Sequence, residues 1–465
     1  MNDMTSRGLY IQTMGCQMNV YDSGRIAALM SPLGFHAAEA AEEADLIVVN
    51  TCAIREKAEQ KAFSLLGRLA EIKRRRPEVV IAAGGCVAQR AGKEILRRAP
   101  CVDIVFGTHA VARLPQMVRD VEDRRCRVVD VEMGDRYEEC ELPGGFGADG
   151  GVSRFVTIMQ GCDNFCTYCV VPFARGREAS RRPERILAEV RTLVENGVRE
   201  VTLLGQNVNS YGRKEGLPGF PELLARVAAV PGLERVRFTT SHPKDLSPAL
   251  ADAFGALEGL CPHLHLPVQS GSDRVLKRMN RRYTRDDYLE KVRWLRAARP
   301  DINLTTDIIV GFPGETEADF QATLELVREV DFGGLFAFVY SDRPGAPAAR
   351  FGDKVPESEG RARLQTLLSL QEAATRRKNE ALVGTRVNVL VEGRGRPAPG
   401  GDGERPWTGR TPGNAIVHMP FLLEGPWADR DLMGETVPVQ VETALAHSLQ
   451  GRPRVLTKGD ACHAA

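Results

Sequence analysis

Residues 155–169 read FVTIMQGCDNFCTYC, an apolar strand candidate followed at once by three closely spaced cysteines. Cys162, Cys166 and Cys169 form a C-x3-C-x2-C arrangement. Thiolates at this spacing can wrap one corner of a cuboidal iron–sulfur cluster, because soft thiolate ligands suit iron and sulfide. Three ligands leave one iron of the cube open, and an open iron can chelate the amino and carboxylate groups of a methionine moiety. The loop therefore predicts a reactive iron–sulfur centre.

Structural zinc is the alternative interpretation of this loop. Zinc sites of that kind usually close with a fourth cysteine or histidine nearby. The chain has no histidine between His109 and His242. The spacing therefore favours an iron–sulfur cluster over zinc.

Short apolar strand candidates alternate with helical patterns after residue 154, which predicts a partial β/α barrel of six strands. In such a barrel the cysteine loop lies at the carboxyl ends of the strands, where barrel enzymes place their chemistry. The strand candidates are 155–159, 201–204, 236–239, 264–268, 304–310 and 335–340. The clearest helical patterns are 183–196, 284–298 and 317–330.

The amino-terminal part carries three more cysteines, each directly after an apolar run. Cys16, Cys52 and Cys86 end the segments YIQTMGC, LIVVNTC and VVIAAGGC. About one strand–helix–strand unit separates each from the next. If the strands are parallel and adjacent, all three thiols lie at one sheet edge, where open α/β sheets bind ligands. Three buried structural cysteines are the alternative.

The remaining patterns divide the chain into domains. We expect an α/β open-sheet domain over residues 1–142, a glycine-rich linker over 143–153, and the barrel with a long connecting helix over 154–383. A small all-β module with strands near 387–391, 415–418 and 436–441 follows over 384–450, and a tail covers 451–465. Residues 393–403 are expected to form a loop. Five other cysteines lack partners at useful spacing and are interpreted as bystanders: Cys101, Cys126, Cys140, Cys261 and Cys462.

Composition and charge limit the setting in which the protein works. The N-terminus has no signal-peptide pattern and no apolar run is long enough to span a bilayer, so we expect a cytoplasmic protein. Disulfides are rare there, which leaves metal binding as the use for clustered cysteines. The net charge is only +1, so local patches would have to hold a nucleic acid. The run Lys73-Arg74-Arg75-Arg76 is one candidate, with a solvated helix end as the favoured alternative.

At these residues the chain resembles the radical SAM methylthiotransferase family, over nearly its full length. Members join an N-terminal three-cysteine domain, a radical SAM barrel and an OB-like TRAM domain, in the order predicted above. The resemblance implies that Cys162, Cys166 and Cys169 hold the catalytic 4Fe–4S cluster that binds S-adenosylmethionine (SAM). It also implies that Cys16, Cys52 and Cys86 hold an auxiliary 4Fe–4S cluster. Other family-like segments are VPFARG (171–176), LGQNVN (204–209), TSHP (240–243), LPVQSG (266–271), DIIVGFPGE (307–315) and YSDRPG (340–345).

Two short segments indicate a branch of the family. TMGCQMN (13–19) with YDS (21–23), and the CDNFCTYC loop itself, look like the MiaB branch. That branch modifies N(6)-isopentenyladenosine at position 37, next to the tRNA anticodon. The resemblance implies transfer of a methylthio group to carbon 2 of the adenine, with one SAM as methyl donor and a second as radical source. Related branches, which act on threonylcarbamoyl-adenosine or on a ribosomal protein, remain as alternatives, and a zinc-stabilised RNA-binding protein without catalysis is a remote one.

The resemblance also suggests roles for residues outside the two cysteine trios. Tyr168, Gln206, Asn207 and Ser241 are candidates for binding SAM, against the alternatives of barrel packing for the tyrosine and loop capping for the others. Arg175 would contact substrate or SAM, against a loop salt bridge, and Asp307 has no assigned role. Implied partners are a tRNA anticodon stem-loop, a flavodoxin-like or ferredoxin-like electron donor and a sulfur donor, and we expect a monomer. Candidate phosphate contacts in the all-β module are Arg386 and Arg410, with Glu392, Asp402 and Glu404 opposing a basic surface.

Overall fold

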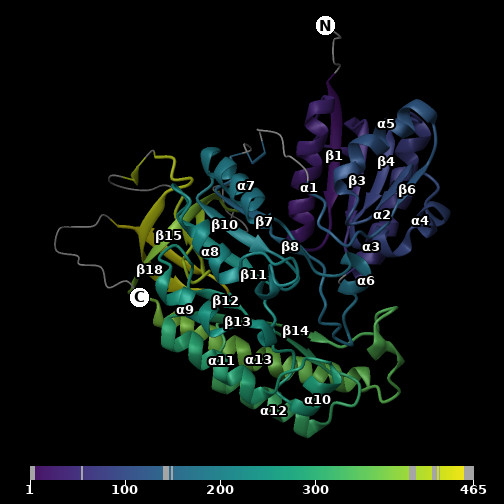
Figure 1. Cartoon of the computed structure of the whole chain (residues 1–465). Helices are drawn as coiled ribbons and strands as arrows, with labels where there is room; N and C mark the ends of the chain where they lie inside the picture. Colours follow the sequence, from purple (N-terminus) through teal and green to yellow (C-terminus); the bar gives the residue numbers. More distant parts are fainter. Residues whose placement is uncertain are drawn as a thin grey trace.

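Three regions follow one another along the chain and are coloured purple to blue, teal to green, and yellow in Figure 1. The computed structural model describes residues 6–53, 56–139, 146–147, 150–396, 405–421, 427–428 and 430–454. Residues 143–145 and 148–149 of the predicted linker, the core of the expected 393–403 loop and the end of the tail lie outside this description. So do Cys140, Asp402, Glu404 and Cys462.

The N-terminal region is an open sheet of six parallel strands in the order β2-β1-β3-β4-β5-β6. Its strands are β1 (Arg7–Thr13), β2 (Phe35–Ala37), β3 (Leu46–Thr51), β4 (Val80–Gly84), β5 (Ile104–Phe106) and β6 (Val128–Asp130). Its helices are α1 (Gln17–Met30), α2 (Glu56–Arg75), α3 (Gly85–Ala91), α4 (Lys93–Arg98) and α5 (Leu114–Arg124). The predicted open-sheet α/β fold is confirmed.

Both faces of this sheet are buried, which explains its uninterrupted apolar strands. Along β3, Leu46 and Val48 belong to the core beneath α1 and α5. Ile47 and Val49 belong to the core on the other face. Successive strand residues point to opposite faces, so a strand covered on both sides must be apolar at every position.

The middle region contains the six parallel strands that the sequence predicts. They form two three-stranded sheets, β11-β10-β7 and β12-β13-β14, linked by a parallel bridge between Val236 and Leu260. The strands are β7 (Ser153–Thr157), β10 (Glu200–Leu204), β11 (Arg235–Thr239), β12 (His263–His265), β13 (Asn303–Val310) and β14 (Gly334–Val339). A short antiparallel pair, β8 (Met159–Gln160) and β9 (Ala179–Ser180), flanks the cysteine loop and was not predicted.

Helices cover the outside of these strands, as Figure 1 shows. They are α7 (Pro183–Glu195), α8 (Phe220–Ala228), α9 (Pro248–Ala256), α10 (Asp273–Arg278), α11 (Arg285–Ala298), α12 (Glu317–Val330) and α13 (Glu357–Ala381). The short helix α6 (Val171–Arg175) instead packs against α3 of the N-terminal region. Thr284 and Thr316 start α11 and α12 with capping boxes, in which each threonine exchanges hydrogen bonds with an aspartate three residues later. The six short 3-10 helices described are η1 (Ser31–Leu33), η2 (Ala41–Glu43), η3 (Val111–Arg113), η4 (Val208–Ser210), η5 (Pro243–Asp245) and η6 (Pro347–Arg350).

The C-terminal region is a small closed barrel in the order β15-β16-β17-β19-β18. Its strands are β15 (Arg386–Arg394), β16 (Trp407–Arg410), β17 (Ile416–Met419), β18 (Thr436–Ala444) and β19 (Leu449–Pro453). The sequence did not indicate β16 or β19, and β19 crosses the expected domain boundary at residue 450. Leu449 and Gly451 are buried while their neighbours are not, so β19 alternates like a strand despite its glycine and proline.

The small barrel is attached at the amino ends of the middle strands. Arg235, at the start of β11, donates to the backbone carbonyls of Arg410 and Asn388 at 2.7 and 3.3 Å. Arg237 donates to the carbonyls of Pro412 and Thr411, both at 2.8 Å. This attachment lies at the opposite end of the strands from the cysteine loop. In the described part of the chain, no helix is long and apolar enough to cross a bilayer.

Candidate active site

The N-terminal cysteines meet at the carboxyl edge of the sheet, as their spacing predicts. Strands β1, β3 and β4 are neighbours and parallel. Cys16 follows β1 as the residue that precedes α1, Cys52 follows β3, and Cys86 is the second residue of α3. The side chains of Cys16 and Cys52 are hydrogen-bonded to each other. Cys52 and Cys86 are both buried.

Two glycines allow the chain segments that carry these cysteines to approach closely. Gly15 has a φ of 102°, and a Cβ there would overlap the Cys52 side chain. Gly85 has a φ of 88°, and a Cβ there would overlap the backbone of Thr51. Only glycine adopts such backbone angles without strain. The three loops could not converge if these positions carried side chains.

The second trio lies in the loop between β8 and α6, after the first strand of the middle region. Nitrogen donors contact its sulfur atoms. Asn164 Nδ2 lies 3.6 Å from Cys162 Sγ, the Val171 amide lies 3.4 Å from Cys169 Sγ, and Arg281 Nη1 lies 3.4 Å from Cys166 Sγ. Such donors orient metal-ligating thiolates and tune the metal they hold.

Five of the six cysteines, from both trios, line one cavity of about 280 Å³, and Cys52 does not. Its lining includes Cys16 and Cys86 from the N-terminal region and Cys162, Cys166 and Cys169 from the middle region. The volume is close to the lower end of the range for small-molecule sites, roughly 300–1,000 Å³. The cavity thus brings together two groups of cysteines that are far apart in sequence.

Burial shifts the pKa of three of these six thiols. It raises the pKa of Cys162 to about 11 and that of Cys169 to about 12, and it raises the pKa of Cys86. Cys16 is different, because the hydrogen bond from Cys52, aided by the charge of Arg175, lowers its pKa to about 6. A bound metal removes the proton from a thiol ligand outright, so buried thiols of raised pKa are compatible with metal binding.

The arrangement of the cysteine side chains bears on whether they bind an iron–sulfur cluster or a single zinc ion. Across the described residues, no group of three or more His, Cys, Asp or Glu side chains is arranged to hold a single metal ion. Structural zinc requires four ligands on one ion. In a cuboidal cluster each thiolate binds a different iron, so its ligands need not converge on one point. The arrangement therefore fits clusters better than zinc.

Two polar side-chain atoms in the cavity have no hydrogen-bond partner among the described residues. Ser241 Oγ and His242 Nε2 are buried and form no hydrogen bond, although 2% and 5% exposure leaves them little access to water. The Nδ1 atom of His242 accepts the Lys244 amide at 3.2 Å, which places the proton of the neutral ring on Nε2. Burial lowers the pKa of His242 well below its ordinary value. Both groups therefore fit a polar ligand such as SAM.

The other candidates for SAM binding differ in what they contact. Tyr168 lines the cavity, and its hydroxyl accepts from Arg281 at 3.3 Å. Gln206 lines it too, and its Oε1 accepts the Gly161 amide at 2.6 Å. Asn207 uses both polar atoms elsewhere, donating to Asp245 at 2.8 Å and accepting the His242 amide at 3.1 Å. This matches the loop-capping alternative for Asn207, so we do not carry it into the proposed SAM site.

Four side chains at this site had no firm assignment or were missed. Asp307 lines the cavity and lies 3.5 Å from His265 Nε2. Arg175 forms a salt bridge, but with Asp22 of the N-terminal region rather than within its own loop. The sequence did not predict a role for Arg281 or His242, although the family-like segment TSHP (240–243) contains His242. Their roles depend on contacts between distant segments, which a single sequence does not display.

The candidate RNA contacts of the small barrel are not free cations. Arg410 pairs with Glu392 at 3.2 Å and donates to Asn414 at 3.3 Å. Arg386 is exposed at the start of β15 and has an interaction partner of its own. Phosphate contact by either residue stays a prediction.

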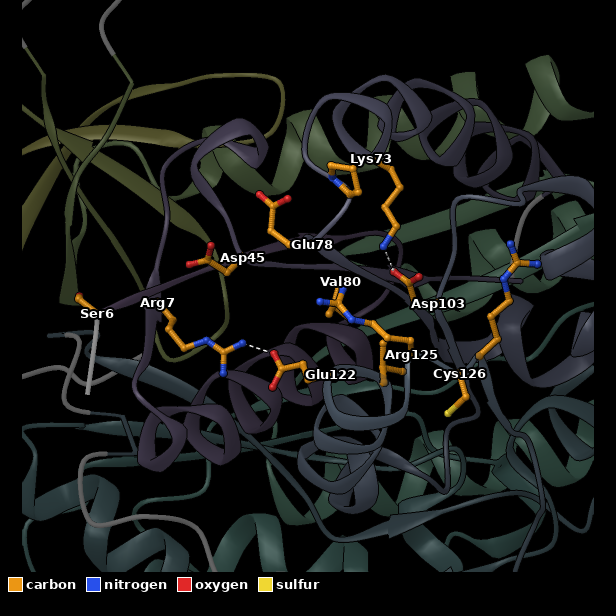
Figure 2. A pocket seen from close by; sticks show the side chains of 13 residues that line it. Ser6, Arg7, Asp45, Lys73, Glu78, Val80, Asp103, Glu122, Arg125 and Cys126 are labelled. Carbon is orange, nitrogen blue, oxygen red and sulfur yellow. Dashed lines mark hydrogen bonds and ion pairs between the residues drawn. The ribbon is translucent and has the colours of Figure 1, made fainter. Parts of the chain in front are cut away.

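A second, larger cavity of about 630 Å³ lies at the opposite edge of the N-terminal sheet (Figure 2). Arg7 pairs there with Glu122, and Lys73 pairs with Asp103 at 2.8 Å. Of the basic run, Arg74 and Arg75 pair with Glu71, and Arg76 pairs with Asp45. These pairs support the helix-end interpretation of residues 73–76.

Three of the cysteines regarded as bystanders, Cys101, Cys126 and Cys261, lie in the described part of the chain. Cys126 lines the second cavity and donates to the Asp120 carbonyl at 3.6 Å. Cys101 donates to the Leu66 carbonyl at 3.3 Å, and Cys261 is buried next to β11. None of the three lines the cavity that the trios share.

Family models match each region in turn. Residues 8–107 match uncharacterized protein family UPF0004, residues 156–327 match the radical SAM superfamily, and residues 380–453 match the TRAM domain. A solved structure, the radical SAM methyltransferase TsrM from Kitasatospora setae, superposes with a TM-score of 0.55 at 14% identity, covering 74% of this chain and 75% of that one. That likeness concerns the fold. Together, the matches and the fold define a radical SAM enzyme, a class that uses a 4Fe–4S cluster and SAM.

Relatives that match nearly the whole chain show to which family of radical SAM enzymes it belongs. One from Desulfosudis oleivorans is 54% identical over 95% of this chain and 96% of its own length, and is named tRNA-2-methylthio-N(6)-dimethylallyladenosine synthase. One from Geobacter sulfurreducens carries the same name and is 50% identical over 97% of this chain and 98% of its own. The chain belongs to the family of tRNA-2-methylthio-N(6)-dimethylallyladenosine synthases.

Proposed function

We propose that this enzyme adds a methylthio group to carbon 2 of N(6)-isopentenyladenosine, also called N(6)-dimethylallyladenosine, at position 37 of tRNA. The observation that carries the proposal is the single cavity that is lined by five of the six cysteines, from both trios. The relatives' shared name supports the substrate. No feature of the site favours the threonylcarbamoyl-adenosine or ribosomal-protein alternatives.

We assign a separate 4Fe–4S cluster to each trio. Cys162, Cys166 and Cys169 would hold the cluster that binds SAM, and Cys16, Cys52 and Cys86 would hold the auxiliary one. When bound, these groups supply radical cleavage of SAM and the transferred sulfur, chemistry that no side chain can provide at an unactivated C–H bond. Two SAM molecules per turnover are part of the proposal.

The chain's own residues bind and orient the reactants and keep water out. Ser241 Oγ and His242 Nε2 would donate hydrogen bonds to SAM, since each lacks a partner in a buried position. Arg281 braces the catalytic trio by contacting both Cys166 and Tyr168. Burial of the cavity protects a reactive intermediate from solvent.

We further propose the partners that this chemistry requires. They are the anticodon stem-loop of tRNA, a flavodoxin-like or ferredoxin-like electron donor and a sulfur donor. The TRAM match supports binding of RNA by the small barrel. A monomeric state and a cytoplasmic location remain expectations.

Nucleoside mass spectrometry of tRNA tests the substrate. A deletion strain should lose 2-methylthio-N(6)-isopentenyladenosine and accumulate the form without sulfur, and the wild-type gene should restore it. A gene in which Cys16, Cys52 and Cys86 are replaced by alanine should not restore the methylthio nucleoside. Unchanged methylthio levels in the deletion strain would refute the proposal, and loss of a methylthio-threonylcarbamoyl nucleoside instead would select the other tRNA branch.

A further inference from the structure

Arg175 is a buried arginine that physically connects the two cysteine trios. It is the last residue of α6, six positions after Cys169. Its side chain leaves the middle region and enters the N-terminal region, where only 4% of it is exposed. A buried guanidinium is costly unless it is paired and hydrogen-bonded, so its contacts indicate what it is for.

The contacts of the Arg175 guanidinium are with the residues around the auxiliary trio. Nη2 donates to Asn19 Oδ1 at 3.0 Å and to Asp22 Oδ2 at 3.2 Å. Cys16 Sγ lies 3.9 Å from the same Asn19 Oδ1, and the charge of the guanidinium acts on both Cys16 and Cys86. Arg175 thus reaches two of the three auxiliary cysteines.

Asn19 extends this connection to the loops that carry the other cysteines. Its Nδ2 donates to the Met14 carbonyl at 2.8 Å, just before Cys16. The same nitrogen donates to the Thr51 carbonyl at 2.9 Å, just before Cys52. Orienting the Asn19 amide therefore fixes the spacing between these two loops.

The backbone around Arg175 is fixed to the N-terminal region as well. His109 Nε2 lies 2.9 Å from the Arg175 carbonyl oxygen. Thr108 Oγ1 donates to the Ala174 carbonyl at 3.0 Å. Hydrogen bonds thus fix both the backbone of Arg175 and its guanidinium group. The guanidinium therefore has a defined position beside the auxiliary cysteines.

We propose that Arg175 is a positioning residue that holds the two cysteine trios in register and sets the reduction potential of the auxiliary cluster. The inference rests on the proposed auxiliary cluster. A buried cation beside a cluster stabilises the reduced, more negative form of the cluster, which raises its potential. The carboxylate of Asp22 has the opposite effect.

A potentiometric titration of the anaerobically reconstituted full-length enzyme, followed by electron paramagnetic resonance, tests the proposal. Wild type should show two one-electron transitions. Arg175→Met should move one of them to lower potential and leave the other in place. Arg175→Lys, which keeps the charge, should restore part of the shift, and Asp22→Asn should move the same transition upward.

Arg181 provides a matched control. It is also a buried arginine that joins the middle region to α1, donating to Tyr21 Oη at 3.0 Å and Glu189 at 2.8 Å, but it contacts no cysteine. Arg181→Met should lower stability without moving either potential. Equal shifts for the Arg175 and Arg181 variants, or no shift for Arg175→Met, would overturn the inference.

Two outcomes keep this inference separate from the proposed function. If wild type loads only one cluster, the two-cluster proposal fails before Arg175 is tested. If Arg175→Met does not fold, Asp22→Asn and Arg175→Lys decide the matter, and an unchanged potential in Asp22→Asn contradicts the assigned role.

Discussion

Gly15 adopts a left-handed backbone directly beside Cys52, so the auxiliary trio depends on the absence of a side chain there. Gly15→Ala should cut iron content from about eight to about four per chain, because the Cys16 and Cys52 loops are forced apart. Colorimetric iron determination after anaerobic reconstitution measures this. Gly67→Ala is the control, since nothing lies within 4 Å of a Cβ at that position. Full iron content in Gly15→Ala would show that the loops tolerate separation.

Ser241 provides a test of the SAM site at a single hydroxyl. Its Oγ is buried and unpartnered in the cavity. Ser241→Ala should weaken SAM binding about 5-fold, the equivalent of one net hydrogen bond of about 1 kcal/mol. Equilibrium dialysis of labelled SAM against the reconstituted enzyme gives the affinity. Ser210→Ala is the matched control, because Ser210 is buried but bonds the Asn207 carbonyl instead. Equal losses in the two variants would argue against a SAM contact.

His242 predicts a pH dependence of stability. Burial holds the pKa of its imidazole well below the ordinary value of 6.5, and the charges of Arg281 and Lys244 add to this. Below pH 6.5 the unfolded chain therefore takes up a proton that the folded chain does not. The free energy of unfolding is therefore unaffected by the titration of His242 above pH 6.5. Below pH 6.5 it falls by up to about 1.4 kcal/mol per pH unit, because protonation favours the unfolded chain.

Urea unfolding at pH 7.5 and pH 5.5 measures this contribution. Wild type should lose more free energy of unfolding on acidification than His242→Gln, which has no group that titrates at that position. Other ionisable groups contribute equally to both proteins and cancel in the comparison. A His242→Gln variant as acid-sensitive as wild type would mean that the imidazole is charged in the folded enzyme.

Helix α13 connects the middle region to the small barrel and shares a buried ion pair with the loop that precedes α12. Arg363 Nη1 lies 2.8 Å from Glu315 Oε1, and their side chains are 4% and 2% exposed. Arg363→Met should lower the free energy of unfolding by about 3–5 kcal/mol, because Glu315 would remain buried without its partner. Thermal unfolding followed by circular dichroism checks this.

Arg361 is the control on the same helix. Its pair with Glu357 is exposed on both sides, and exposed pairs contribute little. Arg361→Met should therefore change stability by less than about 0.5 kcal/mol. If the two variants are equally destabilised, the buried ion pair at Arg363 contributes no more than the exposed one.

The elements that could be predicted are those whose signal is local. The buried strand β3 and the capped helices α11 and α12 have apolar runs or capping residues that can be read in sequence. Strand β16, with the sequence WTGR, has no such pattern and is a strand only because β15 and β17 pair with it. Hydrogen bonds between distant segments supply what the local signal lacks.

The same distinction applies to the candidate site. The cysteine trios could be predicted, because thiol spacing and position after a strand are properties of short segments. Arg281 is 115 residues from the sulfur it contacts, and Arg175 is 153 residues from Asp22. Such pairs form only when segments distant in sequence pack together, so a single sequence gives no sign of them.

At the scale of the whole molecule, the two ends of the middle strands have different tasks. The carboxyl ends face the N-terminal region and enclose the cavity lined by cysteines from both trios. The amino ends anchor the small barrel through Arg235 and Arg237. Figure 1 shows the N-terminal and C-terminal regions on opposite sides of the middle one. An RNA held by the small barrel must therefore extend along the middle region to bring a base to the cavity.

Iron and labile-sulfide content of three proteins tests the central claim that each trio holds its own cluster. After anaerobic reconstitution, wild type should contain about eight irons per chain and as many sulfides. A Cys16/Cys52/Cys86 triple alanine variant and a Cys162/Cys166/Cys169 triple alanine variant should each retain about four. Wild type with about four irons, or a variant that loses all iron, would contradict two independent clusters facing one cavity.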